Sequence, residues 1–163
     1  MSKIGPNKNQ DLLVNKLYDQ GKIKIRGFSM FLGNTRQQSK IWIGAYVVPK
    51  PDQSLLKWMS LTSNYHWQVG MPEASINGEK IMLSVSKHAI LDSGTSLTYV
   101  PTIEYQQVIG ILLRNRNCEI SQGFYWCRCS GVSDSSFPVF SMFFIGSNGN
   151  WVPHFMYPEN YLG

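Results

Sequence analysis

The sequence has no long apolar run, no visible targeting segment and no cluster of basic residues. No stretch approaches the roughly 20 apolar residues that span a bilayer, so no membrane span is expected. Residues 1–25 contain no unbroken apolar stretch of roughly 7–15 residues, so no signal peptide is visible there. The net charge is +5, but the 15 Lys and Arg are scattered instead of forming a stripe, which argues against a nucleic-acid partner.

Residues that ligate metals are also few, with three Cys and three His in the whole sequence. No fourth cysteine completes an all-cysteine zinc site, and no histidine lies close in sequence to the cysteines. We therefore expect no metal and no other cofactor. In an oxidising compartment, two of the three cysteines could form a disulfide. Since residues two positions apart pair poorly, Cys118 would bond either Cys127 or Cys129, and three buried thiols are the alternative.

The residues that are present predict a folded, mostly β domain with two short helices. Hydrophobic residues make up 43% of the 163 positions, which is enough for a core. Helical spacing occurs at residues 9–22 and 101–115, where a Gly ends the first pattern and a Pro opens the second. Asn77-Gly78 lies between apolar runs and predicts a tight hairpin. The expected strands lie at residues 27–33, 39–48, 55–61, 65–71, 74–83, 89–91, 124–129 and 138–146, and residues 151–163 are expected to close the chain as strands and turns.

The stretch "AILDSGTSLTYVP", residues 89 to 101, places a carboxylate at the end of an apolar strand. Asp, Ser, Gly and Thr are turn formers, so one interpretation is an ordinary polar turn. In the other interpretation, Gly94 allows a close backbone approach, and Thr95 and Ser96 supply hydroxyls that orient Asp92. A carboxylate held in this way is a candidate general acid or base.

This stretch resembles the second active-site motif of the pepsin-like aspartic proteases, two hydrophobic residues followed by Asp-(Thr/Ser)-Gly-Thr-Ser. The likeness extends in order and spacing over nearly the whole chain. "KIWIGAY" resembles the strand that usually reads Leu-Phe-Gly-Gly-x-Asp, and "FPVFSMFFIG" resembles Leu-Pro-x-Ile-x-Phe-x-Ile-x-Gly. The resemblance implies one lobe of the bilobal pepsin-like β-barrel, namely the carboxy-terminal lobe.

The resemblance also implies a role for each residue of the motif. Asp92 matches the catalytic aspartate of the second lobe, and Ser93 matches the hydroxyl residue that bonds across the lobe interface. Gly94 matches the glycine whose backbone meets the substrate. Thr95 matches the residue that bonds the outer carboxylate oxygen, and Ser96 matches a residue that touches the substrate backbone.

The likeness has gaps that bear on activity. The sequence contains one Asp-(Ser/Thr)-Gly triplet, whereas the family uses two. We expect residues 1–25 to form the end of the first lobe, with the interlobe helix and entry strand. Residues 26–163 are then a carboxy-terminal lobe that is incomplete at its C-terminal end. The missing first lobe, in cis or in trans, is the expected partner.

The resulting hypothesis is an aspartic endopeptidase that acts on polypeptide substrates through an aspartate dyad and an activated water. This fragment alone is expected to be inactive without a second aspartate. The alternative is a non-catalytic, truncated peptide-binding remnant of such an enzyme. By resemblance, the protein belongs to the secretory pathway, a lysosome or vacuole, or the extracellular space. Glu104, on the second predicted helix, is expected to cap that helix or face water, not to act as a second catalytic acid.

Overall fold

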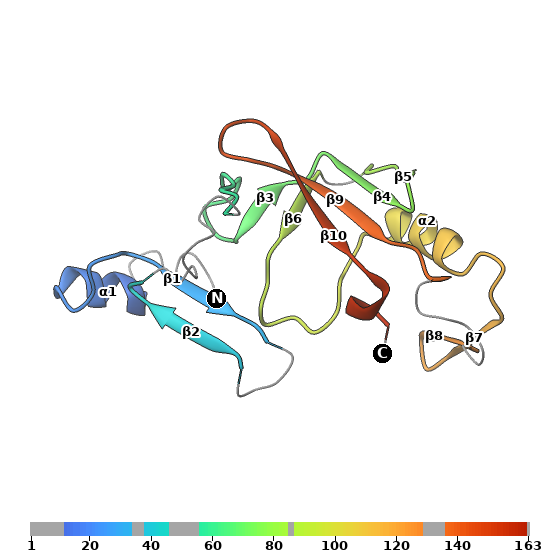
Figure 1. Cartoon of the computed structure of the whole chain (residues 1–163), viewed down its shortest axis with the longest axis horizontal. Helices are drawn as coiled ribbons and strands as arrows, with labels where there is room; N and C mark the ends of the chain where they lie inside the picture. The colour runs from blue at the N-terminus through green and yellow to red at the C-terminus, as the bar shows by residue number, and fades with distance from the viewer. Residues whose placement is uncertain (1–11, 34–37, 46–55, 85–86, 129–135, 163) are drawn as a thin grey trace. The chain divides into compact units, whose positions relative to one another are not determined.

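The computed structural model describes residues 12–33, 38–45, 56–84, 87–128 and 136–162 (Figure 1). Three predicted features extend beyond these ranges, namely the start of the helix at residues 9–11, the end of the strand at residues 46–48, and Cys129. The chain divides into two compact units, which are described separately. The first comprises residues 1–57 and 64–67, and the second comprises residues 58–63 and 68–163.

The first unit contains one helix and one hairpin. Helix α1 spans Leu13–Asp19 and is shorter than the predicted helix. The predicted stop signal is confirmed, because Gly21, two residues after the helix ends, has a φ of 68° in the left-handed region that glycine adopts without strain. Strands β1, Phe28–Phe31, and β2, Lys40–Ile43, pair antiparallel. The ring of Phe28 lies edge-on to that of Trp67, with ring centroids 5.5 Å apart.

The second unit is built on a four-stranded antiparallel sheet with the order β10-β9-β4-β5 (Figure 1). Strand β4 spans Glu73–Ile76, β5 Glu79–Ile81, β9 Phe140–Ile145 and β10 Trp151–Met156. The predicted hairpin at Asn77-Gly78 is confirmed, because these two residues join β4 to β5 with φ values of 51° and 84°. The buried apolar core among the described residues consists of Val69, Ile76, Ile81, Phe137 and Phe144.

Two small sheets and a helix complete this unit. Strand β3, Gln68–Gly70, pairs with β6, His88–Ile90, and β7, Cys118–Ser121, pairs with β8, Phe124–Cys127. Helix α2 spans Thr102–Leu112, and a short 3-10 helix, η3, spans Pro158–Asn160. The prediction of a mostly β chain with two short α-helices is therefore confirmed.

The strand predicted at residues 55–61 is wrong for the part that the structure describes. Residues 56–61 make only two isolated bridges, from Met59 to Gly146 and from Leu61 to Val69. The apolar pattern suited a strand, but the segment contacts two different partners at single points. A continuous ladder with one neighbour, which a strand requires, therefore does not form.

Candidate active site

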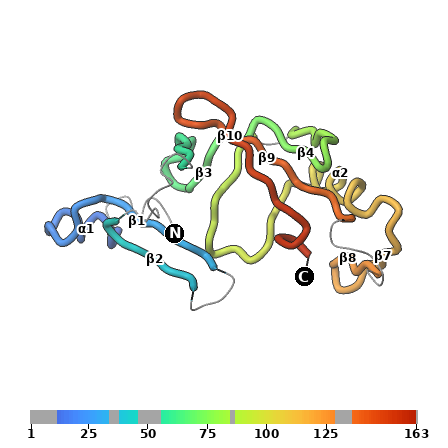
Figure 2. Tube along the Cα trace, viewed as in Figure 1, coloured from blue at the N-terminus to red at the C-terminus, as the bar shows by residue number. Residues whose placement is uncertain are grey.

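The segment between β6 and α2 carries the Asp-Ser-Gly-Thr-Ser motif, and Figure 2 traces it in yellow-green as a long open arc. At its entrance, β6 is fixed by pairing with β3, where Gln68 faces Ile90 and Gly70 faces His88. Gly70 allows a close approach to β9, since a Cβ there would lie 2.9 Å from Cδ1 of Ile145. The strand ends at Ile90, one residue before its predicted end at residue 91, and Asp92 follows two residues after it.

Both oxygens of the Asp92 carboxylate accept hydrogen bonds from the same loop. The backbone N–H of Gly94 donates to Oδ1 at 2.9 Å, and the hydroxyl of Thr95 donates to Oδ2 at 2.6 Å. The backbone N–H of Thr95 also approaches the carbonyl oxygen of Asp92, at 3.4 Å. These contacts, here called the Asp92 clamp, fix the plane of the carboxylate. A side chain at position 94 would crowd the clamp, because a Cβ there would lie 3.3 Å from Oδ1.

The other two motif residues, Ser93 and Ser96, lie on the same loop and are exposed. The two hydrogen bonds of the clamp come from Gly94 and Thr95 instead. The clamp therefore brings Asp92, Gly94 and Thr95 of the five motif residues together.

The whole loop lies at the surface of this chain. Every residue from 91 to 103 is exposed, and the apolar members include Leu97 at 56% and Tyr99 at 79%. Aspartate chemistry on a peptide bond needs a site from which bulk water is excluded, because water screens the charges that act on the substrate. Within the described residues, the clamp orients a carboxylate but no part of the loop is buried.

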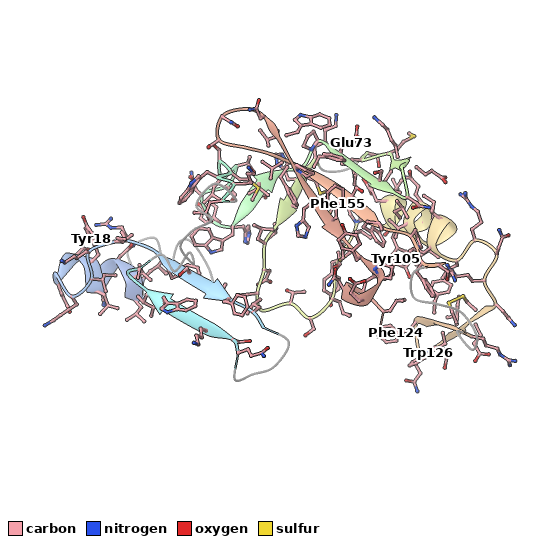
Figure 3. All side chains as sticks on the ribbon, viewed as in Figure 1. Tyr18, Glu73, Tyr105, Phe124, Trp126 and Phe155 are labelled. Carbon is pink, nitrogen blue, oxygen red and sulfur yellow. A yellow bond between two sulfur atoms is a disulfide. The ribbon has the colours of Figure 1, made fainter. Side chains whose placement is uncertain are left out.

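A disulfide joins Cys118 and Cys127, which face each other across the β7–β8 hairpin with Cα atoms 4.0 Å apart. It is the yellow bond of Figure 3, where Phe124 and Trp126 mark the same hairpin. This pair is one of the two that the sequence left open. Cys129 lies outside the described residues.

The expectation that Glu104 caps its helix or faces water is wrong. The residue is only 3% exposed, and its Oε1 accepts hydrogen bonds from the backbone N–H of Ser84 at 2.8 Å and from the Ser84 hydroxyl at 3.2 Å. Sequence reasoning considered this carboxylate alone. The overlooked signal was its spacing, because Glu104 and Gln107 are three positions apart and share one face of the helix.

The part of the chain that the structure describes contains no group of three or more His, Cys, Asp or Glu residues placed to hold a metal ion. In the same residues, neither helix has the length and apolar character needed to traverse a bilayer.

Comparison with known proteins decides the family. The family model for eukaryotic aspartyl proteases matches residues 3–155. The chain belongs to the eukaryotic aspartyl protease family. Among curated proteins, it is 26% identical over 128 residues to pepsin A of Rhinolophus ferrumequinum, covering 78% of this chain and 32% of that protein. It is 21% identical over 150 residues to pregnancy-associated glycoprotein 2 of Bos taurus, covering 92% and 37% of the two chains.

A third relative, pepsin A of Suncus murinus, is 30% identical over 87 residues, which cover 53% of this chain and 22% of that protein. The chain thus spans about a third of the length, or less, of the curated relatives that it matches. The resemblance to pepsin-like proteases that the sequence motif indicated is confirmed at the level of the family.

Proposed function

We propose that this chain supplies one catalytic aspartate, Asp92, to an aspartic endopeptidase that cleaves polypeptide substrates. The observation that carries the proposal is the Asp92 clamp, found in a member of the aspartyl protease family. A carboxylate whose two oxygens are held by a backbone N–H and a hydroxyl has a fixed orientation, which general acid–base chemistry on a bound substrate requires.

The chemistry needs a second carboxylate. Two carboxylates about 3 Å apart cannot both ionise easily, so the pair shares one proton. The ionised partner takes a proton from a water molecule, which attacks the carbonyl carbon of the scissile bond. The protonated partner donates its proton to the carbonyl oxygen. The other carboxyl, which now carries the proton taken from water, gives it to the leaving amine as the C–N bond breaks, and the first carboxylate takes back a hydroxyl proton. Both pKa values then belong to the pair and not to either residue.

The second carboxylate is proposed to come from a first lobe, supplied in cis or in trans. The sequence holds one Asp-Ser-Gly triplet, and the loop that carries it is exposed from residue 91 to residue 103. Leu97 and Tyr99 give this loop an apolar surface that a partner lobe would cover. In this proposal residues 26–163 belong to the second lobe and residues 1–25 to the end of the first.

The protein is further proposed to act in an oxidising compartment, which means the secretory pathway, a lysosome or vacuole, or the extracellular space. The Cys118–Cys127 disulfide supports this location, because such bonds persist where thiols are not kept reduced. The placement agrees with the family to which the chain belongs.

The second candidate function is a peptide-binding remnant that has no catalytic activity. The specific observation in its favour is the exposure of the Asp92 loop, which leaves a single aspartate on an open surface. In this reading the clamp is a stable turn and the loop binds extended peptides without cleaving them.

The two functions differ in how they respond to Asp92→Asn. The assay is cleavage of a denatured protein at acid pH, by this chain assembled with its first lobe, with and without the transition-state analogue pepstatin. We expect Asp92→Asn to reduce cleavage by about 10³-fold or more, since loss of one member of a catalytic unit has effects of that order. Asp19→Asn is the matched control, because Asp19 is an exposed carboxylate in α1 that pairs with Arg26.

Cleavage that persists in Asp92→Asn would refute the enzymatic proposal. Peptide binding, measured by fluorescence anisotropy, separates the second candidate. A remnant would bind peptide equally well before and after the substitution and would cleave nothing.

A further inference from the structure

Helix α2 is attached to the edge of the four-stranded sheet by polar side chains as well as by half-buried apolar ones. Glu104 is its one buried residue. Three contacts, here called the polar ladder, join helix α2 and the turn after it to β5 and the segment that follows β5. They are Arg114 with Glu79, Gln107 with Met82, and Glu104 with Ser84.

The middle contact of the ladder pairs both backbone groups of one residue, as a neighbouring strand would. The side-chain oxygen of Gln107 accepts from the backbone N–H of Met82 at 2.9 Å, and its amide nitrogen donates to the Met82 carbonyl at 3.2 Å. Strand β5 lies at one edge of the sheet, and backbone groups at an edge otherwise have no ladder partner. The contact gives both backbone groups of Met82, the residue after β5, a partner and so fixes the helix beside this edge.

The contact at Glu104 is the one closest to the Asp92 loop. Glu104 lies in the first turn of α2, just after the loop ends at Pro101, and its partner Ser84 precedes β6. The contact closes a segment of 20 residues that contains the whole Asp92 loop. A buried carboxylate is costly unless it is hydrogen-bonded, and Ser84 supplies both a backbone N–H and a hydroxyl.

We propose that Glu104 is a positioning residue for the Asp92 loop. Its buried carboxylate ties the first turn of α2 to Ser84 and so fixes the exit of the loop, while the β3–β6 pairing fixes the entrance. With both ends held, the clamp formed by Gly94 and Thr95 keeps one geometry. Any effect of Glu104 on catalysis rests on the proposed function. Its effect on the geometry of the Asp92 loop does not.

The far contact of the ladder serves as an internal comparison. Arg114 donates two hydrogen bonds of 3.0 Å to Glu79, but both side chains are at least half exposed. Exposed ion pairs contribute little, because solvent screens them. Loss of this contact should leave the Asp92 loop unchanged, whereas loss of the contact at Glu104 should not.

The test measures water exchange of the Gly94 and Thr95 amides by NMR, because both amides donate within the Asp92 turn. In Glu104→Ala we expect these two amides to exchange about tenfold faster, as for loss of hydrogen bonds to a charged group. Amides of β9 and β10 should be unaffected. Glu104→Gln should restore slow exchange, because its amide oxygen can accept the same two bonds. Gln106→Ala, at an exposed neighbour on α2, is the control and should match wild type.

Two results would overturn the inference. One is unchanged exchange at Gly94 and Thr95 in folded Glu104→Ala, and the other is an equal rise at every amide, which would mean a general loss of stability. If Glu104→Ala does not fold, Ser84→Ala provides the test, since it removes only the hydroxyl bond. It should raise exchange at the same two amides by about twofold.

The exchange measurement needs no substrate, so it can succeed or fail independently of the proposed protease activity. In an active assembly, Glu104→Ala should lower kcat with little change in KM, and Glu104→Gln should restore kcat. Recovery with Gln separates positioning from a role as a proton carrier, because an amide cannot exchange a proton with substrate.

Discussion

Removing the Cys118–Cys127 disulfide should cost a calculable part of the stability of the second unit. The two cysteines are nine positions apart, so the bond closes a loop of about ten residues in the unfolded chain. The chain-entropy model gives about 2.7 kcal/mol at 25 °C for a loop of that length. For a protein of this size, about 1 kcal/mol shifts Tm by about 2–4 °C, so Cys118→Ser or Cys127→Ser should lower Tm by about 5–11 °C.

The assay is thermal and urea unfolding of oxidised wild type, Cys118→Ser, Cys127→Ser and Cys129→Ser, each with and without a thiol reductant. Wild type should lose stability on reduction, and the first two variants should be insensitive to the reductant. Cys129→Ser is the matched control and should keep both the stability and the sensitivity of wild type.

The response of each variant to the reductant tests the Cys118–Cys127 pairing directly. If Cys129→Ser abolished the effect of the reductant while Cys127→Ser preserved it, the bond would join Cys118 to Cys129. If the reductant changed nothing in wild type, no disulfide would contribute, and the support for an oxidising compartment would be lost.

Three further outcomes follow from the geometry. Ile76 is fully buried, so Ile76→Ala should reduce the free energy of unfolding by about 2–5 kcal/mol in a urea titration. Gly78→Ala should cost about 1–2 kcal/mol because φ is 84° there, whereas Gly110→Ala, inside α2 with open space at its Cβ, should stabilise by about 0.5–1 kcal/mol. Hydrogen bonds from Arg114 hold the pKa of Glu79 below its usual value, so Arg114→Met should raise that pKa in an NMR titration. Because Arg114 lowers the pKa of Glu79 in the folded state, the contact stabilises the fold only while Glu79 is ionised. The destabilisation by Arg114→Met should therefore be fully present above the unfolded-state pKa of Glu79, and it should vanish as the pH falls through the folded-state pKa.

Local features of this chain could be read from the sequence because their causes are local. Asn77-Gly78 forms its hairpin because these two residues adopt positive φ with little strain. The Asp92 turn forms from residues within three positions of one another, all inside one short motif. In both cases the residues that determine the structure are neighbours in the sequence.

Features that depend on distant partners could not be read in the same way. Glu104 is buried because Ser84, 20 positions away, provides its hydrogen bonds, and no periodicity within α2 reveals that partner. The segment at residues 56–61 has the apolar pattern of a strand but contacts two partners at single points. Strand β7 was not predicted, because its sequence is too polar to indicate a strand. It joins a sheet only by pairing with β8, to which the disulfide also links it.

The Asp92 clamp bears on how much a partner lobe would have to supply. Orientation of the carboxylate is already set within the loop, by Gly94 on one oxygen and Thr95 on the other. A partner would then need to add a second carboxylate and to exclude water, without reorganising this loop, and preorganised groups are the ones that catalyse well. If Glu104 also holds the exit of the loop, the orientation survives contact with the partner. Under the proposed function, the exposed loop would then be half of a prepared site, and activity would depend on what covers residues 91 to 103.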